Sequence, residues 1–206
     1  EHHVDPVVKD GIKIMSMGFL VADNQPVIWR GPMVHGALTQ FLTQVKWGEL
    51  DYLLIDMPPG TGDAQLTISQ TAPVSGAIIV TTPQDVSLLD ARKGLLMFQN
   101  VHVPILGVIE NMAGYVCSEC QHTTHLFRQG GGQKISKEMG VSLLGSIPLD
   151  EKIAVGGDTG KPIVVSHPDS LVGKLYTQMA GTVAAQLSIL NSQGTGQFKP
   201  MDLQWQ

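Results

Sequence analysis

"LLIDMPPGTGD", residues 53–63, is the stretch of this sequence that says most about its fold. A β-rich apolar run ends there in an acid, Asp56, and continues into Pro-Pro-Gly. An acid at the tip of a buried strand can hold Mg²⁺ through water, and a glycine soon after it lets a backbone N–H approach a terminal phosphate. Asp56 and Gly60 fit these two roles. A strand followed by a plain Pro-Gly turn, with Asp56 facing water, fits the local sequence equally well.

Around this stretch, short apolar runs alternate with helical patterns. The apolar runs predict strands over residues 12–17, 51–56, 76–82, 104–110, 142–148 and 161–165. The 3.6-residue periodicity predicts helices over residues 32–45, 64–72, 86–100, 131–140 and 166–190, with Asp85 as the cap of the third. Continuous rather than alternating apolar strands are typical of a parallel sheet that helices cover on both faces. The sequence therefore predicts an α/β fold.

The position of the chemistry follows from this fold class. Open parallel sheets bind ligands beyond the carboxyl ends of their strands. The predicted strands end at Asp56, Thr82, Glu110 and Pro148, so functional residues are expected just after these positions. We expect one domain over residues 1–190 and a polar, loosely held tail over 191–206.

Composition excludes several classes of function. The formal net charge is −5 and no basic run occurs, which argues against a nucleic-acid surface. No apolar run reaches the roughly 20 residues that a membrane-spanning helix needs. Hydrophobic residues make up 43% of the chain and charged residues 15%, which is enough for a substantial core and too apolar for a disordered chain.

The two cysteines, Cys117 and Cys120, form one C-x-x-C pair. A single pair fits a metal or redox role in a reducing compartment better than a disulfide framework. Two thiolates fill half of the four-ligand shell that soft metals and iron–sulfur clusters usually have. A homodimer whose two-fold axis passes through this loop would supply all four, because such an axis brings each residue to its own copy.

Three other interpretations of the same loop stay open. His122 and His125 follow the cysteines closely, so one chain could offer two sulfurs and a nitrogen to Zn²⁺, although the spacing is cramped. A redox dithiol would need a helix N-terminus just after the first cysteine, where the sequence indicates a loop. The two thiols could also bind nothing.

The motif D-x-P-P-G-x-x-D at residues 56–63 resembles the switch II segment of MinD-like, deviant-Walker P-loop NTPases. Longer segments resemble one branch of that class, the Mrp/ApbC family of iron–sulfur cluster carriers, from about Ile12 to Leu190. These segments are "WGELDYLLIDMPPGTGDAQLTISQ" (47–70), "GAIIVTTPQDVSLLDARKG" (76–94) and "VPILGVIENMAGYVCSEC" (103–120). The resemblance implies a P-loop NTPase fold that is incomplete at its N-terminus, because no G-x-x-x-x-G-K-[ST] occurs in the 206 residues.

The resemblance also assigns roles to particular residues. It implies that Asp56, Gly60 and Asp63 sense Mg²⁺ and the γ-phosphate, that Asn111 contacts adenine, and that Pro148 packs on the ring. The local alternative for Asn111 is a residue bonded to its own backbone. Arg30, just before a predicted helix, could reach a phosphate or pair with a surface carboxylate.

The function that the resemblance implies is ATP-dependent carriage of a [4Fe–4S] cluster. The cluster would bridge the Cys117 and Cys120 pairs of a homodimer, with zinc as an alternative occupant, and pass to apoproteins. ATP and Mg²⁺ would serve the intact protein, whereas this chain alone is expected to lack ATPase activity. The alternatives are a MinD/ParA-type positioning ATPase and a zinc-binding, non-catalytic module. We expect a bacterial cytoplasmic protein, with the mitochondrial matrix as the alternative, and no nucleic-acid or membrane partner.

Overall fold

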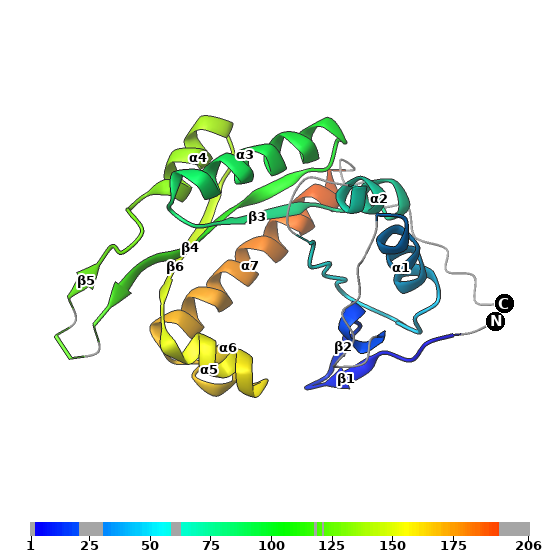
Figure 1. Ribbon diagram of the computed structural model, residues 1–206, viewed down its shortest axis with the longest axis horizontal. Coiled ribbons are helices and arrows are strands. Elements are labelled where there is room, and N and C mark those ends of the chain that lie inside the picture. Colours follow the sequence, from blue (N-terminus) through cyan, green and yellow to red (C-terminus); the bar gives the residue numbers. More distant parts are fainter. Residues whose placement is uncertain (1–2, 21–30, 59–62, 118, 121, 194–206) are drawn as a thin grey trace. The chain divides into compact units, whose positions relative to one another are not determined.

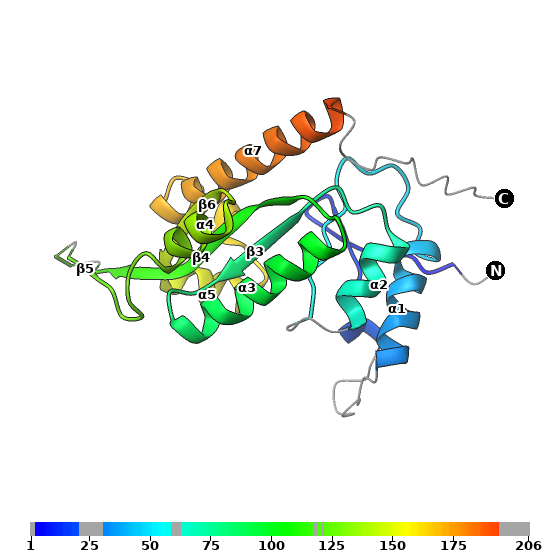
Figure 2. The ribbon, with the colours of Figure 1, turned by 90° about the horizontal axis from the view of Figure 1, so that it is seen from above.

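The computed structural model describes residues 3–20, 31–58, 63–117, 119–120 and 122–193. The chain forms two compact units that divide between Pro73 and Val74. Figures 1 and 2 show the elements of each unit from two directions. The prediction of a single domain over 1–190 with a tail from 191 stays a prediction.

The first unit opens with a hairpin that the sequence analysis missed in part. Strands β1 (Val7–Lys9) and β2 (Ile12–Ile14) pair antiparallel around Asp10 and Gly11. Both turn residues have positive φ, 50° and 77°, as a two-residue hairpin turn of type I′ requires. Of the two strands, only the second lies within a predicted strand, that over residues 12–17. A 3₁₀ turn, η1 (Met17–Leu20), follows.

Two helices of the first unit were predicted correctly, and one strand was not. Helices α1 (Gly31–Thr43) and α2 (Asp63–Thr71) pack against each other. The prediction of a strand over residues 51–56 is wrong, since residues 52–58 have no regular structure and Leu54 is 87% exposed. A strand exists only where a neighbour satisfies its backbone, and the described part of the chain provides none here.

The second unit confirms the α/β class with a central parallel sheet. Strand β4 lies between β3 and β6, parallel to both, and β5 extends it antiparallel. These strands span Ala77–Thr81 (β3), Ile105–Val116 (β4), Thr123–Thr124 (β5) and Leu143–Leu149 (β6). The helices are α3 (Asp85–Asn100), α4 (Gly131–Met139), α5 (Glu151–Thr159), α6 (Ile163–Ser166) and α7 (Leu171–Ser192).

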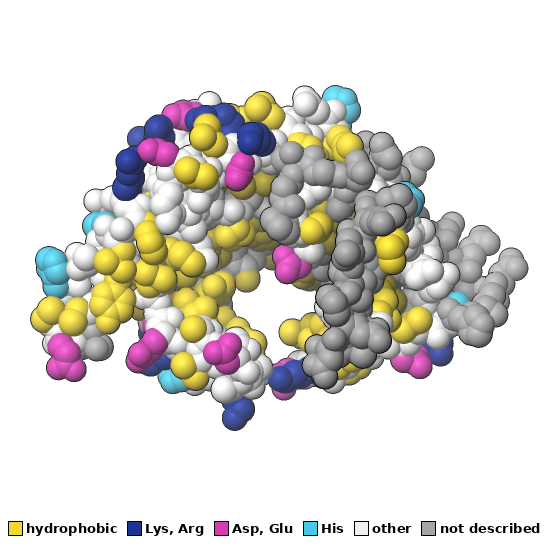
Figure 3. Space-filling model, in the orientation of Figure 1, with side chains coloured by type: hydrophobic (Ala, Val, Ile, Leu, Met, Phe, Trp, Pro, Cys, Tyr) yellow, Lys and Arg dark blue, Asp and Glu magenta, His cyan; other side chains and the backbone are white. Residues whose placement is uncertain are grey.

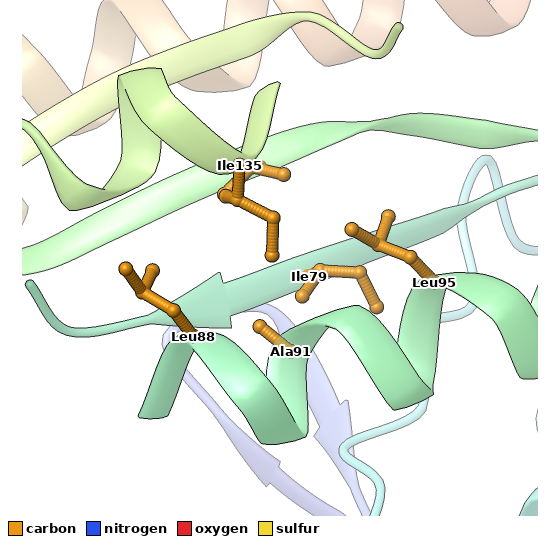
Figure 4. Packing of buried hydrophobic residues seen from close by; sticks show 6 residues of the cluster. Ile79, Leu88, Ala91, Leu95 and Ile135 are labelled. Carbon is orange, nitrogen blue, oxygen red and sulfur yellow. The ribbon is translucent and has the colours of Figure 1, made fainter. Parts of the chain in front are cut away.

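Helices cover the two faces of this sheet and create two cores. On one face, α3 and α4 bury a cluster around Leu95, which is 0% exposed (Figure 4). That cluster contains Ile79, Leu88, Ala91, Leu95, Val108 and Ile135. On the other face, α7 contacts β6 and β4 and buries Ile147, Ile163, Val172 and Met179. Strand β3 is not covered on both faces: its residues alternate between buried and exposed, and Val80 is 61% exposed. The prediction that the strands are buried on both faces is therefore wrong for β3.

Three local predictions in this unit are wrong for identifiable reasons. Residues 161–165 form no strand, because α6 begins there directly after Pro162. The final helix begins at Leu171 rather than at 166, and the Ser170 side chain caps it by accepting the Gly173 N–H at 3.0 Å. Asp85 is the first residue of α3 rather than its cap, and its carboxylate pairs with Arg128.

A pair of adjacent glycines in α5 offers a matched test of this packing. A Cβ on Gly156 would lie 2.6 Å from the Lys161 carbonyl oxygen, whereas a Cβ on Gly157 would meet nothing within 4 Å. We expect Gly156→Ala to lower the free energy of unfolding by about 1–3 kcal/mol through overpacking. Gly157→Ala should raise it by up to about 1 kcal/mol through helix propensity. Urea denaturation of both variants checks this, and equal effects would contradict the packing.

Candidate functional site

The two cysteines lie at the tip of a hairpin that β4 and β5 form. Tyr115 pairs with Thr124 and Val116 with Thr123, and the Cys117 N–H donates to the His122 carbonyl oxygen at 3.0 Å. The hairpin projects from the sheet, at the left of Figure 1. The strand predicted to end at Glu110 therefore continues to Val116, since it pairs first with β6 and then with β5.

Both thiols are free, and the surroundings of Cys117 favour its metal-binding form. Cys117 is half-buried and Cys120 is exposed. Hydrogen bonds from the backbone N–H groups of Cys120 and Glu119, and then from the Cys120 side chain, hold the pKa of the Cys117 thiol below its ordinary value. Such bonds stabilise a thiolate, which is the form of cysteine that binds metals. The hairpin tip thus presents two free thiols, one of which has hydrogen bonds that favour the thiolate.

The nearby histidines are arranged differently. The His125 Nδ1 lies 2.9 Å from the Ala113 carbonyl oxygen. A carbonyl oxygen only accepts, so Nδ1 carries the proton and the ring is held against the backbone of β4. The part of the chain that the structure describes contains no group of three His, Cys, Asp or Glu side chains able to hold a metal ion. The described residues therefore do not assemble the intrachain Cys–His zinc site.

Asn111 and Pro148, predicted to contact the adenine, lie close together. Asn111 pairs with Ile147 across β4 and β6, and Pro148 is the next residue along β6. The pairing slips between Asn111 and Tyr115, where Met112 has a φ of 57°. Proline, which has no N–H, is tolerated at such an irregularity. The Asn111 Oδ1 accepts the Met112 N–H at 2.9 Å, which is the local backbone contact that the sequence left open.

The predicted switch residues belong to the first unit. Asp56 is exposed in an irregular segment. Asp63 begins α2, whereas Gly60 and Arg30 lie outside the described residues. Sequence reasoning missed Gln65, which is 4% exposed and whose Nε2 donates to the Pro58 carbonyl oxygen at 2.9 Å. This bond ties the double-proline segment to α2.

Sequence reasoning also missed that the carboxylate of Glu110, on the strand that leads to the hairpin, is buried. Glu110 is 3% exposed, and its Oε2 accepts the backbone N–H of Gly132 at the start of α4. A Cβ on Gly132 would lie 2.7 Å from the Glu110 Cβ, and one on Gly131 would lie 2.8 Å from the Pro83 Cα. The glycine run at 130–132 therefore permits close packing of α4. The sequence did contain one indication of this buried carboxylate, namely a single acid within an apolar strand.

No helix among the described residues is long and apolar enough to cross a membrane.

Comparison of the sequence with known proteins shows which family the chain resembles. A family model described as "ParA: NUBPL iron-transfer P-loop NTPase" matches residues 1–184. An "Iron-sulfur cluster carrier protein" of Pseudomonas fragi is 54% identical over 177 residues, covering 86% of this chain and 62% of that protein. The "Iron-sulfur cluster transfer protein NUBPL" of Mus musculus is 48% identical over 182 residues, covering 88% and 57%. The chain thus spans less than two thirds of these curated relatives.

Solved structures place the fold in the same class. A nucleotide-binding protein in complex with ADP from Archaeoglobus fulgidus is 35% identical, with a TM-score of 0.67 over 82% of this chain and 65% of that one. The cell division ATPase MinD of Pyrococcus furiosus is 25% identical, with a TM-score of 0.52 over 66% and 53%. Sequence, fold and cysteine hairpin agree: the chain belongs to the NUBPL iron-transfer branch of the MinD-like P-loop NTPases, as its resemblance to the Mrp/ApbC carriers predicts.

Proposed function

We propose that this chain is part of an ATP-dependent carrier that holds an iron–sulfur cluster between two copies of itself and passes it to apoproteins. The observation that carries the proposal is the Cys117 and Cys120 pair on the projecting β4–β5 hairpin, with its thiolate-stabilising hydrogen bonds. The printed names of the relatives, carrier and transfer protein, support it. A cluster at a hairpin tip is accessible to a recipient, which suits delivery.

A symmetric dimer would complete the ligand set. One hairpin provides two sulfurs, and a [4Fe–4S] cluster takes four cysteine ligands. Two hairpin tips related by a two-fold axis provide four equivalent thiolates. Zinc would take the same four sulfurs in a tetrahedral arrangement. Cys120 is exposed, so little of the protein needs to move for the two tips to meet.

The nucleotide part of the proposal concerns Asp56, Gly60, Asp63, Asn111 and Pro148. The acids and the glycine would sense Mg²⁺ and the γ-phosphate, and the other two would contact the base. The ADP complex of the Archaeoglobus fulgidus protein supports a nucleotide site in this family. Hydrolysis of ATP would be coupled to cluster transfer in the intact protein. The 206-residue chain contains no P-loop motif, so we expect it to show no ATPase activity by itself.

The proposed location follows the bacterial relatives. The chain resembles both the Pseudomonas fragi carrier and the Mus musculus transfer protein. A bacterial cytoplasm suits a free dithiol, and the mitochondrial matrix is the alternative.

The test is anaerobic reconstitution with iron and sulfide, followed by size separation with light scattering. Each cluster takes four cysteine ligands, two from each chain. We therefore expect about one [4Fe–4S] cluster for every two chains, found only in the dimer fraction. Ligand binding to the dimer should raise its fraction by mass action over the untreated chain, run as a control. Iron and sulfide that travel with a monomer would contradict the bridging arrangement.

A further inference from the structure

The outer surface of α3 and α4 is positively charged in a chain that is negative as a whole. We call it the α3–α4 surface, defined by these two helices and Arg128. It carries five of the 13 Lys and Arg residues of the chain, namely Arg92, Lys93, Arg128, Lys134 and Lys137. Figure 3 shows Lys and Arg side chains over this part of the molecule, with Asp and Glu side chains among them. Their acidic neighbours are Asp85, Asp90 and Glu138, so the surface has an excess of positive charge whereas the whole chain is at −5.

The excess positive charge is concentrated on α4. Arg92 pairs with Glu138, Arg128 with Asp85, and Lys93 with Asp90 at 3.2 Å. Lys134 and Lys137 are exposed and make no ion pair with a carboxylate of the described residues. Two ammonium groups thus remain available to an acidic partner.

A hollow with both apolar and charged lining lies between α3 and α4, and Lys134 is one of the residues that line it. It has a volume of about 270 Å³, and the side chains of Leu88, Leu89 and Ile135 line it between α3 and α4. Four charged side chains also line it: Lys134, Arg92, Asp85 and Glu138. The two acids are paired with Arg128 and Arg92, so the unpaired charge in the lining is that of Lys134. Leu89 is 53% exposed, and Val86, one turn earlier, is 72% exposed. A partner that inserted an apolar side chain here would remove this surface from water while its carboxylates met the lysines.

We propose that the α3–α4 surface docks an acidic, amphipathic segment of an apoprotein that receives the cluster; this rests on the proposed function. An amphipathic helix in a groove combines apolar anchors with charges along its edges, and both are complementary to this surface. Nucleic acid fits less well. The exposed Leu89 in the hollow favours a partner that offers an apolar side chain, which a sugar-phosphate backbone lacks.

The docking surface is tied physically to the cysteines. The Glu110 carboxylate on β4 accepts the Gly132 N–H at the start of α4. The same strand continues to Val116, one residue before Cys117. A partner bound to α4 is therefore connected to the strand that carries the cysteines. This connection would keep the carrier and the recipient together during transfer.

The test uses the 206-residue chain and a defined probe, a fluorescently labelled apo-ferredoxin with an acidic surface. Binding is measured by anisotropy at low salt and at 1 M salt. The double variant Lys134→Glu/Lys137→Glu is compared with Lys152→Glu/Lys174→Glu, which changes the net charge equally at exposed positions on α5 and α7. We expect roughly tenfold weaker binding for the first variant at low salt and less than twofold for the second. The difference should vanish at 1 M, where the Debye length is about 3 Å.

A separate substitution, of Leu89, tests the apolar part of the surface. Leu89→Ser should weaken binding about fivefold at both salt concentrations, because hydrophobic contact is not screened. Circular dichroism should show all variants folded, since the altered side chains are exposed.

Several results would overturn the docking surface. These are no binding of the probe by the unmodified chain, equal losses in the two double variants, or tighter binding of a duplex DNA through the same lysines. Cluster loading, followed by absorbance, separates the two proposals. A chain that loads normally but binds the probe without regard to Lys134 and Lys137 contradicts only the docking. A chain that never loads contradicts the proposed function.

Discussion

Replacing either Cys117 or Cys120 with alanine is expected to abolish cluster binding rather than halve it. Each chain then offers one sulfur, so a symmetric pair of chains supplies two of the four ligands that a [4Fe–4S] cluster takes. Iron and sulfide per chain after anaerobic reconstitution measure the effect, and we expect both to fall to the background of a chain that lacks both cysteines. The dimer fraction should no longer respond to iron and sulfide.

The matched control for these variants is His122→Ala. Only the backbone carbonyl of His122 bonds to Cys117, and the substitution keeps that group. Loading should therefore stay near that of the unmodified chain. His125→Ala should also load, although loss of the ring contact with the Ala113 carbonyl oxygen loosens the base of the hairpin. A metal centre held by a monomer and lost with His122 would replace the bridging arrangement by an intrachain site.

The sequence predicted correctly the elements that depend on residues close together in the chain. The helices α1, α2, α3 and α4 follow from apolar residues that recur every three or four positions. Helix α4 is followed by Gly140, whose φ of 65° is typical of a helix end. The cysteine pair was found by its rarity. Its setting was not, because β5 has only two residues and pairs with a strand reached across a turn. Nothing in two threonines indicates such a pairing.

Long-range contacts explain the main failures. Residues 51–56 have the composition of a strand, yet β propensity describes how well side chains fit a paired strand and cannot supply the partner. Glu110 was predicted to end a strand. In the structure it lies inside β4, and its carboxylate accepts a backbone N–H from the start of α4. That role depends on Gly132, 22 residues away. The adenine role of Asn111 stays a prediction, and its bond to the Met112 N–H supports the local interpretation as well.

Replacing Glu110 with alanine is expected to lower the free energy of unfolding of the second unit by about 2–4 kcal/mol. Glu110 is 3% exposed, so the substitution leaves a cavity and deprives the Gly132 N–H of its acceptor where water has little access. Glu110→Gln is the matched control, because its amide oxygen can still accept from Gly132. That variant should lose only about 1 kcal/mol, the value of a negative charge at a helix N-terminus.

Two measurements distinguish the variants of Glu110. Urea denaturation gives the free energies, and amide hydrogen exchange shows where the structure opens. In Glu110→Ala the amides in the first turn of α4 should exchange faster, while those of α7, on the other face of the sheet, should change only by the global loss of stability. Equal stability of the alanine and glutamine variants would show that the carboxylate does not hold α4. The link between α4 and the cysteine-bearing strand would then rest on the packing of Ile135 in the cluster that contains Val108, because no other side-chain hydrogen bond among the described residues joins β4 to the start of that helix.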